Sequence, residues 1–138
     1  MKTLDELSAE LHPRAEIGGR NVLVVDDEGA VRRFAVRVLE REGYSVVEAK
    51  DGLEALEAVC QGEVSFEVVI SDIVMPRMNG VELMQKLATS HPELPVILMS
   101  GYATTALSEL GIAAPCSILA KPFSPESLLT EVRRCAKR

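Results

Sequence analysis

Five polar side chains in this sequence are of types that bind metal ions and negatively charged oxygen atoms. They are Asp26, Asp27, Asp72, Ser100 and Lys121, and each stands at or just beyond the end of a short apolar run. If the three carboxylates lie together, they repel one another unless a cation sits among them. Hard oxygen ligands without soft ones favour Mg²⁺, ahead of Mn²⁺ and Ca²⁺. The sequence therefore predicts a divalent-cation site, provided that the fold brings these residues together.

The apolar setting of Asp72 raises a question about its charge. In the segment VVISDIVMP, residues 68–76, only Ser71 and Asp72 carry polar side chains. A lone carboxylate in such surroundings would be protonated or paired, because removing its charge from water is costly. A divalent cation would keep it ionised. With the metal, Ser100 and Lys121 receiving phosphoryl oxygens, Asp72 would be able to attack phosphorus and form an acyl phosphate.

Strand and helix signals alternate along the chain after Arg20. Short runs rich in Val, Ile and Leu are typical of strands buried on both faces, and apolar residues at helical spacing occupy the stretches between them. The predicted strands are Asn21–Asp26, Tyr44–Ala49, Phe66–Asp72, Leu94–Ser100 and Cys116–Ala120. The predicted helices are Glu28–Glu42, Leu53–Gln61, Val81–Thr89, Tyr102–Leu110 and a last one that Ser124 caps and that runs to Lys137.

This order of elements predicts an α/β fold with a doubly wound parallel sheet of five strands. A parallel connection needs a crossover, which a helix supplies, and right-handed crossovers place helices on both faces of the sheet. Binding sites in such folds lie outside the carboxyl ends of the strands. The five candidate residues stand at or next to those ends, so we expect them to converge at one edge of the sheet.

Composition narrows the class of protein. The chain has 138 residues, of which 47% are hydrophobic and 26% charged, as is ordinary for one globular domain with its own core. The net charge of −6 argues against nucleic acid as the main partner, because phosphate binding needs a basic face. No apolar run approaches the roughly 18 residues of a membrane span, and the first residues lack the apolar centre of a secretory signal. We therefore expect a cytoplasmic protein without a membrane partner.

Residues 1–20 differ from the rest of the chain, and we interpret them as an N-terminal tail or linker that is partly helical. Leu4, Leu7 and Leu11 have helical spacing, and a stretch containing Pro and Gly then interrupts the pattern. The globular domain would span residues 21–138. The three leucines are candidates for pairing with a partner protein or with a second copy of the chain, which would make a homodimer.

The cysteines indicate reduced thiols. Cys60, Cys116 and Cys135 are odd in number and widely spaced, and no CxxC pair is present for zinc binding or redox chemistry. Cys116 is expected to pack at the start of a strand, with redox sensing as the weaker alternative. We therefore predict free thiols in a reducing compartment.

Four segments carry a resemblance to a known family. VLVVDDE, SDIVMPRMNG, LMSGYA and AKPF occur in the order, and near the spacing, of the receiver domain of two-component response regulators, the CheY-like superfamily. The resemblance extends from about Asn21 to the C-terminus. It implies a flavodoxin-like (βα)5 fold with strand order 2-1-3-4-5. The segments SDIVMP and LMSGYA, with the linker before Asn21, also resemble receivers fused to histidine kinases, and a stand-alone receiver remains the other option.

The resemblance also implies a role for each candidate residue. Asp72 would be the phosphoacceptor, and Mg²⁺, or else Mn²⁺, would be the cofactor. The metal ligands would be Asp26, Asp27, Asp72 and the backbone carbonyl of Val74; Ser100 and Lys121 would bind the phosphoryl group, and Pro122 would supply a cis Lys–Pro peptide bond.

One position departs from the family pattern. Receivers usually carry Tyr or Phe three residues before the site lysine, and Ile118 stands there in this chain. In the family that ring turns inward when the Ser or Thr moves toward the phosphoryl group, so Ile118 puts the usual readout in question. Tyr102, two residues after Ser100, is a candidate to replace part of it.

The leading hypothesis is a phosphoacceptor domain of a two-component phosphorelay. Asp72 would take a phosphoryl group from a histidine kinase or a histidine phosphotransfer protein and thereby switch protein–protein contacts. Such a domain assists its own phosphorylation and autodephosphorylation but is not an enzyme with a separate substrate. Two alternatives stay open, a docking pseudo-receiver that is never phosphorylated and an aspartate-dependent phosphatase. Phosphatases of that kind generally place a second Asp two residues after the nucleophile, where this chain has Val74.

Overall fold

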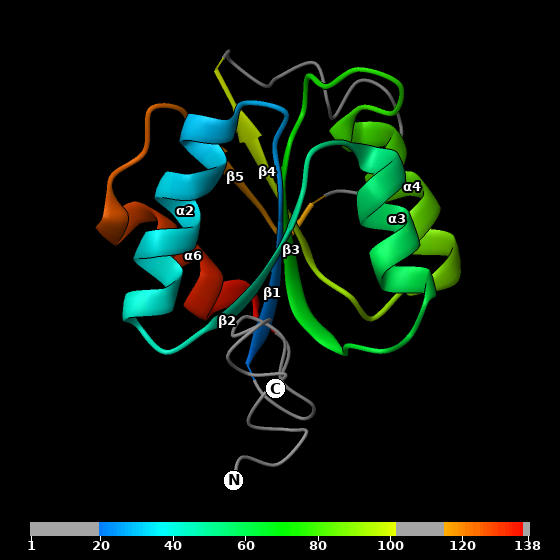
Figure 1. Ribbon diagram of the computed structural model, residues 1–138, viewed down its shortest axis with the longest axis horizontal. Coiled ribbons are helices and arrows are strands. Elements are labelled where there is room, and N and C mark those ends of the chain that lie inside the picture. Colours follow the sequence, from blue (N-terminus) through cyan, green and yellow to red (C-terminus); the bar gives the residue numbers. More distant parts are fainter. Residues whose placement is uncertain (1–19, 102–114, 137–138) are drawn as a thin grey trace, which may run out of the picture.

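The computed structural model describes residues 20–101 and 115–136 (Figure 1). Within them the predicted elements are present, with ends shifted by at most two residues. The predicted tail and the predicted helix Tyr102–Leu110 lie outside the described residues. The described elements are β1 (Asn21–Val25), α2 (Gly29–Arg41), β2 (Ser45–Ala49), α3 (Gly52–Cys60), β3 (Phe66–Asp72), α4 (Gly80–Ser90), β4 (Val96–Ser100), β5 (Ser117–Ala120) and α6 (Pro125–Cys135).

The five strands form one parallel sheet in the order β2-β1-β3-β4-β5, so the predicted flavodoxin-like topology is confirmed. In the pairing register, Val25 lies opposite Ser71, and Asp72 lies opposite Met99. Ser100 lies opposite Ala120 on the next strand. The carboxyl ends of β1, β3, β4 and β5 therefore meet at one edge of the sheet.

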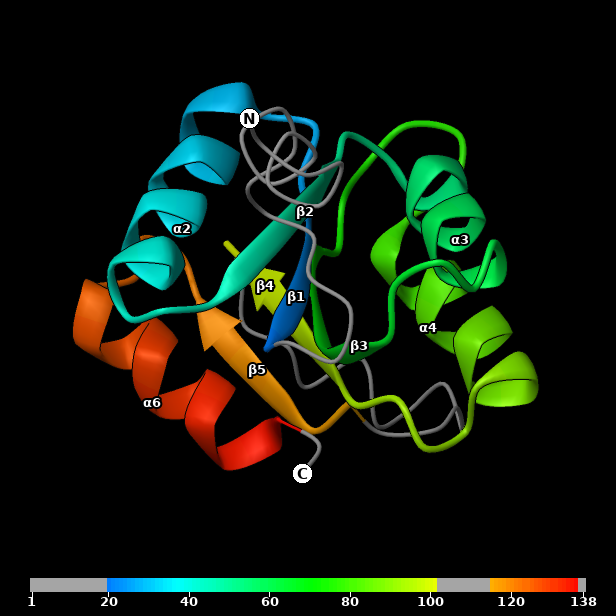
Figure 2. The same ribbon diagram turned by 60° about the horizontal axis from the view of Figure 1, so that its bottom comes forward.

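Each face of the sheet has its own apolar core. Val22 and Val24 of β1 pack with the core on the side of α2 and α6, whereas Leu23 and Val25 pack with the core on the side of α3 and α4. Figures 1 and 2 show the sheet between these two pairs of helices. The side chains of these four β1 residues are fully buried on both faces, and this explains why they form a continuous apolar run and do not alternate with polar residues.

The described helices are short and amphipathic. α2, the longest of them, has 13 residues and turns Ala35, Val38 and Leu39 toward the sheet. Among residues 20–101 and 115–136, no helix is long and apolar enough to cross a membrane.

Local signals at the helix starts explain where three of these helices begin. The Asp51 side chain accepts a hydrogen bond from the Glu54 backbone N–H at the start of α3. Asn79 and Glu82 form a reciprocal capping box at the start of α4. Ser124 caps α6, as predicted. Each cap satisfies backbone N–H groups that have no partner inside the helix, so these side chains stabilise the helix starts that follow β2, β3 and β5.

The prediction of free thiols at Cys116 and Cys135 is wrong, because the two residues form a disulfide bond. They are separated by 19 positions in sequence, but β5 and α6 return the chain so that their Cα atoms lie 6.0 Å apart. The spacing in sequence could not reveal this pairing, since it arises from a strand and a helix that lie side by side. Cys60 is a free cysteine.

The fold predicts different outcomes for alanine at two glycines that both begin a helix. A Cβ on Gly80 would lie 2.2 Å from the Asp72 backbone oxygen, whereas a Cβ on Gly29 would meet the flexible end of the Arg33 side chain. Gly80→Ala is expected to lower the free energy of unfolding by about 2 kcal/mol because backbone must move. Gly29→Ala should change it by no more than about 0.5 kcal/mol.

Urea unfolding followed by circular dichroism measures both variants. The two alanines are introduced at equivalent helix positions, so a difference in their effects reports the packing against Asp72. Equal unfolding free energies for the two variants would contradict the close packing of Gly80 on β3.

Candidate functional site

The three acidic residues picked out by the sequence lie together at the carboxyl edge of the sheet. Each of Asp26, Asp27 and Asp72 offers a carboxylate oxygen within 4.8 Å of those of the other two. Asp26 is fully buried and Asp72 is 8% exposed, whereas Asp27 faces solvent. The cluster therefore has a buried floor and one open side, which suits an ion that enters from water.

Lys121 contributes the positive charge beside these acids. Its Nζ lies 2.9 Å from an Asp26 carboxylate oxygen and 3.3 Å from an Asp72 carboxylate oxygen. Its backbone N–H donates to the Ser100 carbonyl at 2.8 Å, and this fixes the residue just beyond the end of β5. The Lys121–Pro122 peptide bond is cis. The ammonium thus joins the ends of β1 and β3, two strands that differ in sequence position by more than forty residues.

Burial and charge act on the two central side chains in opposite directions. Burial raises the pKa of the Asp72 carboxyl, the charge of Asp26 adds to the increase, and Lys121 opposes it. Burial alone would lower the pKa of Lys121, but the hydrogen bond and charge of Asp26, with Asp72, raise it above its usual value. Lys121 is therefore held in its charged form, and Asp72 is held in a site that disfavours its ionised form unless more positive charge is present.

The loop after Asp72 is held close to the strand end. The Gly80 N–H donates to the Ile73 carbonyl at 2.9 Å, and the absence of a Gly80 side chain lets α4 begin against the Asp72 backbone. Val74 lies on this loop with its side chain 68% exposed, so that side chain contributes little to the core. The role of the Val74 carbonyl as a metal ligand stays a prediction.

The other predicted site residues lie at different distances from the acids along the strands. Ser100 is the last residue of β4 and is 7% exposed. Ile118 is on β5, two positions before that strand ends, and lies opposite Leu98 of β4. It is 38% exposed. Tyr102 lies outside the described residues. The structure thus brings Ser100 to the acidic edge and leaves Ile118 part-way down the sheet.

The net charge of the cluster matches that of a divalent cation. Three carboxylates and one ammonium carry a formal charge of −2, and the ligand atoms are all oxygens. An all-oxygen set with one side open to water is the donor chemistry of Mg²⁺ sites, in which water completes the coordination. The residues present therefore fit a hard divalent ion.

Comparison with known proteins agrees with this geometry. The response regulator receiver domain matches the chain over residues 22–133. The chain belongs to this family. The matched segment begins within β1 and ends within α6, so it covers nearly all of the described fold.

Relatives of the receiver domain include both short and long proteins. This chain is 32% identical to the response regulator receiver protein CpdR of Brucella abortus, and the alignment covers 83% of this chain and 95% of that protein. It is 41% identical to the sensor kinase CckA of the same organism over 88% of this chain, but that match spans only 13% of the kinase. The similarity to CckA therefore describes one part of a much longer protein.

Solved structures support the same fold. The chemotaxis protein CheY4 of Vibrio cholerae is 30% identical and aligns with a TM-score of 0.78, covering 85% of this chain and 98% of that one. The receiver domain of NtrX from Brucella abortus is 32% identical, with a TM-score of 0.74 and coverage of 83% and 97%.

Arg32 supports the acidic edge of this receiver and was missed by the sequence reasoning. Its Nη1 donates to the Asp26 carbonyl at 2.6 Å, and its Nε lies 3.0 Å from a Glu48 carboxylate oxygen. The guanidinium thus ties the residue after β1 to β2. In sequence nothing separates Arg32 from Arg33 or Arg37 on the same helix, so only the folded structure could single it out.

A second missed feature is the contact between the Asp72 loop and the start of α3. Arg77 has a positive φ of 66° and forms an ion pair with the buried Asp51 side chain. Next to it, Met78 packs against Gly52, where a Cβ would lie 2.7 Å from the Met78 carbonyl oxygen. The φ value is unusual for a residue with a side chain and is maintained by these surroundings. These contacts fix the loop after Asp72 against the start of α3.

The site predicts opposite stability effects for two substitutions in metal-free buffer at pH 7. Asp72→Asn is expected to raise the urea midpoint, because the raised pKa of Asp72 means that its ionised form destabilises the fold. Lys121→Met is expected to lower the free energy of unfolding by about 3 kcal/mol, since it leaves buried carboxylates without a counter-charge.

The stabilisation expected from Asp72→Asn depends on pH, because the pKa of Asp72 is raised in the folded protein. The folded pKa of Asp72 lies above the ordinary value of 3.8, so the penalty is absent below that pH and grows as the pH rises through the folded pKa. Added Mg²⁺ should stabilise the unsubstituted protein more than Asp72→Asn. A midpoint for Asp72→Asn below that of the unsubstituted protein, in metal-free buffer at pH 7, would refute this electrostatic description.

Proposed function

We propose that this chain is a phosphoacceptor that receives a phosphoryl group on Asp72 from a phosphohistidine, with Mg²⁺ as the cofactor. The observation that carries the proposal is the cluster of Asp26, Asp27 and Asp72 with Lys121 between two of them. The donor would be a histidine kinase or a histidine phosphotransfer protein. Family membership supports this assignment, and the relatives include a sensor kinase and response regulators.

The transfer joins an Asp72 carboxylate oxygen to phosphorus while the phosphorus–nitrogen bond of the phosphohistidine breaks. The imidazole leaves with the bonding electron pair, and the product is an acyl phosphate. The nucleophile must be ionised, and Lys121 at 3.3 Å favours that form of Asp72. Mg²⁺, when bound, would supply the remaining positive charge that the phosphoryl oxygens require.

The residues that would hold Mg²⁺ are Asp26, Asp27, Asp72 and the backbone carbonyl of Val74, and Mn²⁺ would fit the same set. Asp27 is the exposed member and would meet the ion first, whereas Asp26 is fixed below it by Lys121. Ser100 and Lys121 would then contact the phosphoryl oxygens. Lys121 already lies between two carboxylates, so it would exchange one anionic partner for another without leaving the site.

Phosphorylation would change the surface near β4 and β5. The added group brings about −1.5 to −2 charges, which is enough to bias a two-state element. We infer that Ser100 would follow the phosphoryl group. Ile118 has no ring to turn inward and no hydroxyl to anchor it, so the coupling through β5 would be weaker than in receivers with an aromatic residue there.

Hydrolysis of small phosphoesters is less well supported than phosphoacceptance. An aspartate phosphatase needs an acid or base near the nucleophile, and Val74 stands where a second Asp would be expected. The Val74 side chain cannot donate or accept a proton. The domain would therefore help its own phosphorylation and dephosphorylation without a separate substrate. A docking role that never uses Asp72 would leave the cluster of Asp26, Asp27 and Asp72 without a function.

The chain around the receiver domain fits two arrangements. Similarity to CckA supports a receiver joined to a sensor kinase, and similarity to CpdR supports a protein that consists largely of a receiver. In either case we propose that residues 1–20 serve as a tail or linker and residues 21–138 as the receiver, acting in the cytoplasm. Pairing through the tail leucines would give a homodimer.

Incubation with acetyl phosphate and Mg²⁺ is expected to add the mass of one phosphoryl group to the chain, at Asp72. Asp72→Asn should remove the labelling, and Asp27→Asn should slow it by at least tenfold through weaker metal binding. Intact-mass spectrometry and Phos-tag gels measure both. Glu57→Gln, which changes an exposed acid on α3, is the matched control and should leave the rate unchanged.

Two outcomes would refute the assignment. One is equal labelling of the unsubstituted protein and Asp72→Asn. The other is an absence of labelling both by acetyl phosphate and by a panel of phosphorylated histidine kinases, in protein that binds Mg²⁺.

Beryllofluoride with Mg²⁺ is expected to shift amide resonances of Ser100 and of β5, since it imitates the phosphoryl group on Asp72. Ile118→Tyr should extend the shifts farther along β5 and into α6, because a ring at this position can move with Ser100. Nitrogen–proton NMR spectra of both proteins measure the effect. Spectra in which β5 and α6 are unchanged by beryllofluoride would contradict the proposed switching.

A further inference from the structure

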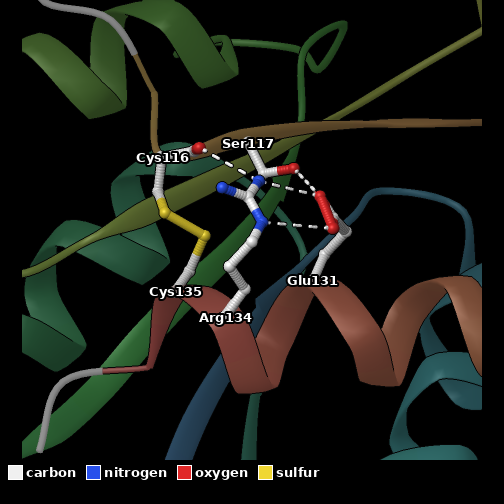
Figure 3. The surroundings of a disulfide bond; sticks show 5 residues. All are labelled: Cys116, Ser117, Glu131, Arg134 and Cys135. Atoms are coloured by element: carbon white, nitrogen blue, oxygen red, sulfur yellow. Dashed lines mark hydrogen bonds and ion pairs between the residues drawn. A yellow bond between two sulfur atoms is a disulfide. The ribbon is translucent and has the colours of Figure 1, made fainter.

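A second cluster of reactive and charged side chains lies where β5 begins and α6 ends. Figure 3 shows the disulfide between Cys116 and Cys135, with Ser117, Glu131 and Arg134 around it. The Cys116 N–H donates to the Val96 carbonyl at 2.8 Å, so the bond sits at the amino edge of the sheet. Asp72 stands at the opposite, carboxyl edge. The disulfide is therefore separate from the acidic site.

The two sulfur-bearing residues differ in exposure. Cys116 is an exposed residue, whereas Cys135 is 7% exposed and belongs to the core between α6 and the sheet. A thiolate arriving from solvent can therefore attack at Cys116, and Cys135 is the sulfur that leaves toward the protein. Cys60 is exposed on α3, which covers the other face of the sheet, so it takes no part.

Polar contacts hold the same strand and helix together independently of the sulfur–sulfur bond. The Ser117 hydroxyl donates to the Glu131 carboxylate, and the Arg134 guanidinium lies 2.9 Å from that carboxylate. Arg134 also donates to the Cys116 carbonyl at 3.4 Å. The hydrogen bonds that Glu131 accepts from Arg134 and Ser117 lower the pKa of its carboxyl, which is thus ionised and paired near neutral pH.

Burial of the α6 side chains adds to this attachment. Leu128 and Val132 are fully buried against the sheet. With the polar contacts, they keep β5 and α6 adjacent when the sulfurs are not bonded. The thiols of Cys116 and Cys135 would then remain close enough to re-form the bond, which is the condition for a reversible pair.

We infer that Cys116 and Cys135 form a reversible thiol–disulfide site whose reaction partner is a protein dithiol. A thiolate of the dithiol attacks the Cys116 sulfur, forms a mixed disulfide and releases Cys135, which takes up a proton. The second thiol of the partner then attacks the mixed disulfide and frees Cys116. The receiver gains two electrons and two protons, and the partner leaves oxidised to its own disulfide.

A dithiol fits this site better than a monothiol. A monothiol leaves a mixed disulfide on Cys116, and the adjacent Cys135 thiol displaces it and restores the original bond. A dithiol removes the mixed disulfide by its own second thiol. The site therefore discriminates between the two classes of reductant through the closeness of Cys135.

Reduction is expected to loosen the last turn of α6 on β5 and to leave the acidic edge unchanged. The bond closes a loop of 19 positions, and its loss removes a constraint on the unfolded chain. The thermal midpoint should fall by about 10 °C. The initial rate of labelling by acetyl phosphate, or the Mg²⁺ affinity if no labelling occurs, should stay the same within twofold, so the test does not depend on the proposed function.

The experiment uses the full chain carrying Cys60→Ser, so that every titrated thiol belongs to the pair. After treatment with oxidised dithiothreitol, native protein should show no thiol toward a maleimide–polyethylene glycol reagent, and after reduced dithiothreitol it should show two. Glutathione at the same thiol concentration should reduce a smaller fraction. Hydrogen exchange should become faster in residues 131–136 on reduction and stay unchanged in residues 66–72.

Cys116→Ser and Cys135→Ser serve as matched controls, because each removes the bond while keeping a side chain of similar size. Both should show the low thermal midpoint in either buffer. Two free thiols after oxidation would overturn the inference, and so would a bond that native protein keeps in reduced dithiothreitol. A change of more than twofold in labelling or Mg²⁺ affinity on reduction would overturn the separation of the two sites.

Discussion

The ammonium of Lys121, lying between Asp26 and Asp72, is the interaction on which the site depends. Two acidic strand ends are buried at the same edge, and their repulsion would push the ends of β1 and β3 apart. Lys121 offsets part of that repulsion but leaves the cluster, with Asp27, at a formal charge of −2. This remaining charge is what makes a divalent cation the matching partner. Burial raises the pKa of Asp72, and the charge of Asp26 adds to that increase, so a bound divalent cation would relieve an electrostatic penalty that the fold already carries.

The rest of the fold positions that interaction. A parallel sheet places the carboxyl ends of all its strands at one edge. The two apolar cores fix the strand register that brings Asp26, Asp72 and Lys121 next to one another. Contacts outside the cluster then fix the loops, through Arg32 on the Asp26 carbonyl and Gly80 against the Asp72 backbone. Buried strands allow little adjustment, so the polar groups at their ends are held in place before any ligand arrives.

The pattern of buried parallel strands predicted the sheet, and the rule for where strand ends meet predicted the gathering of the acidic residues. The strand order came from the resemblance to receiver domains. Sequence reasoning did not predict the contacts between elements, because the helical or strand periodicity of the sequence does not reveal them. The Cys116–Cys135 bond depends on how the end of α6 lies on β5, and Arg32 is distinguished from neighbouring arginines only by which side of α2 faces β2. The positive φ of Arg77 likewise follows from packing on α3, since the residue type disfavours it.

The central claim is that the three carboxylates bind a divalent ion beside Lys121, and the most direct test is a crystal structure of the full chain grown with Mn²⁺ and read from its anomalous signal. The account predicts a strong peak within coordination distance of carboxylate oxygens from at least two of Asp26, Asp27 and Asp72, with Lys121 still adjacent. A fully occupied Mn²⁺ elsewhere on the molecule, together with no peak at this cluster, would contradict it.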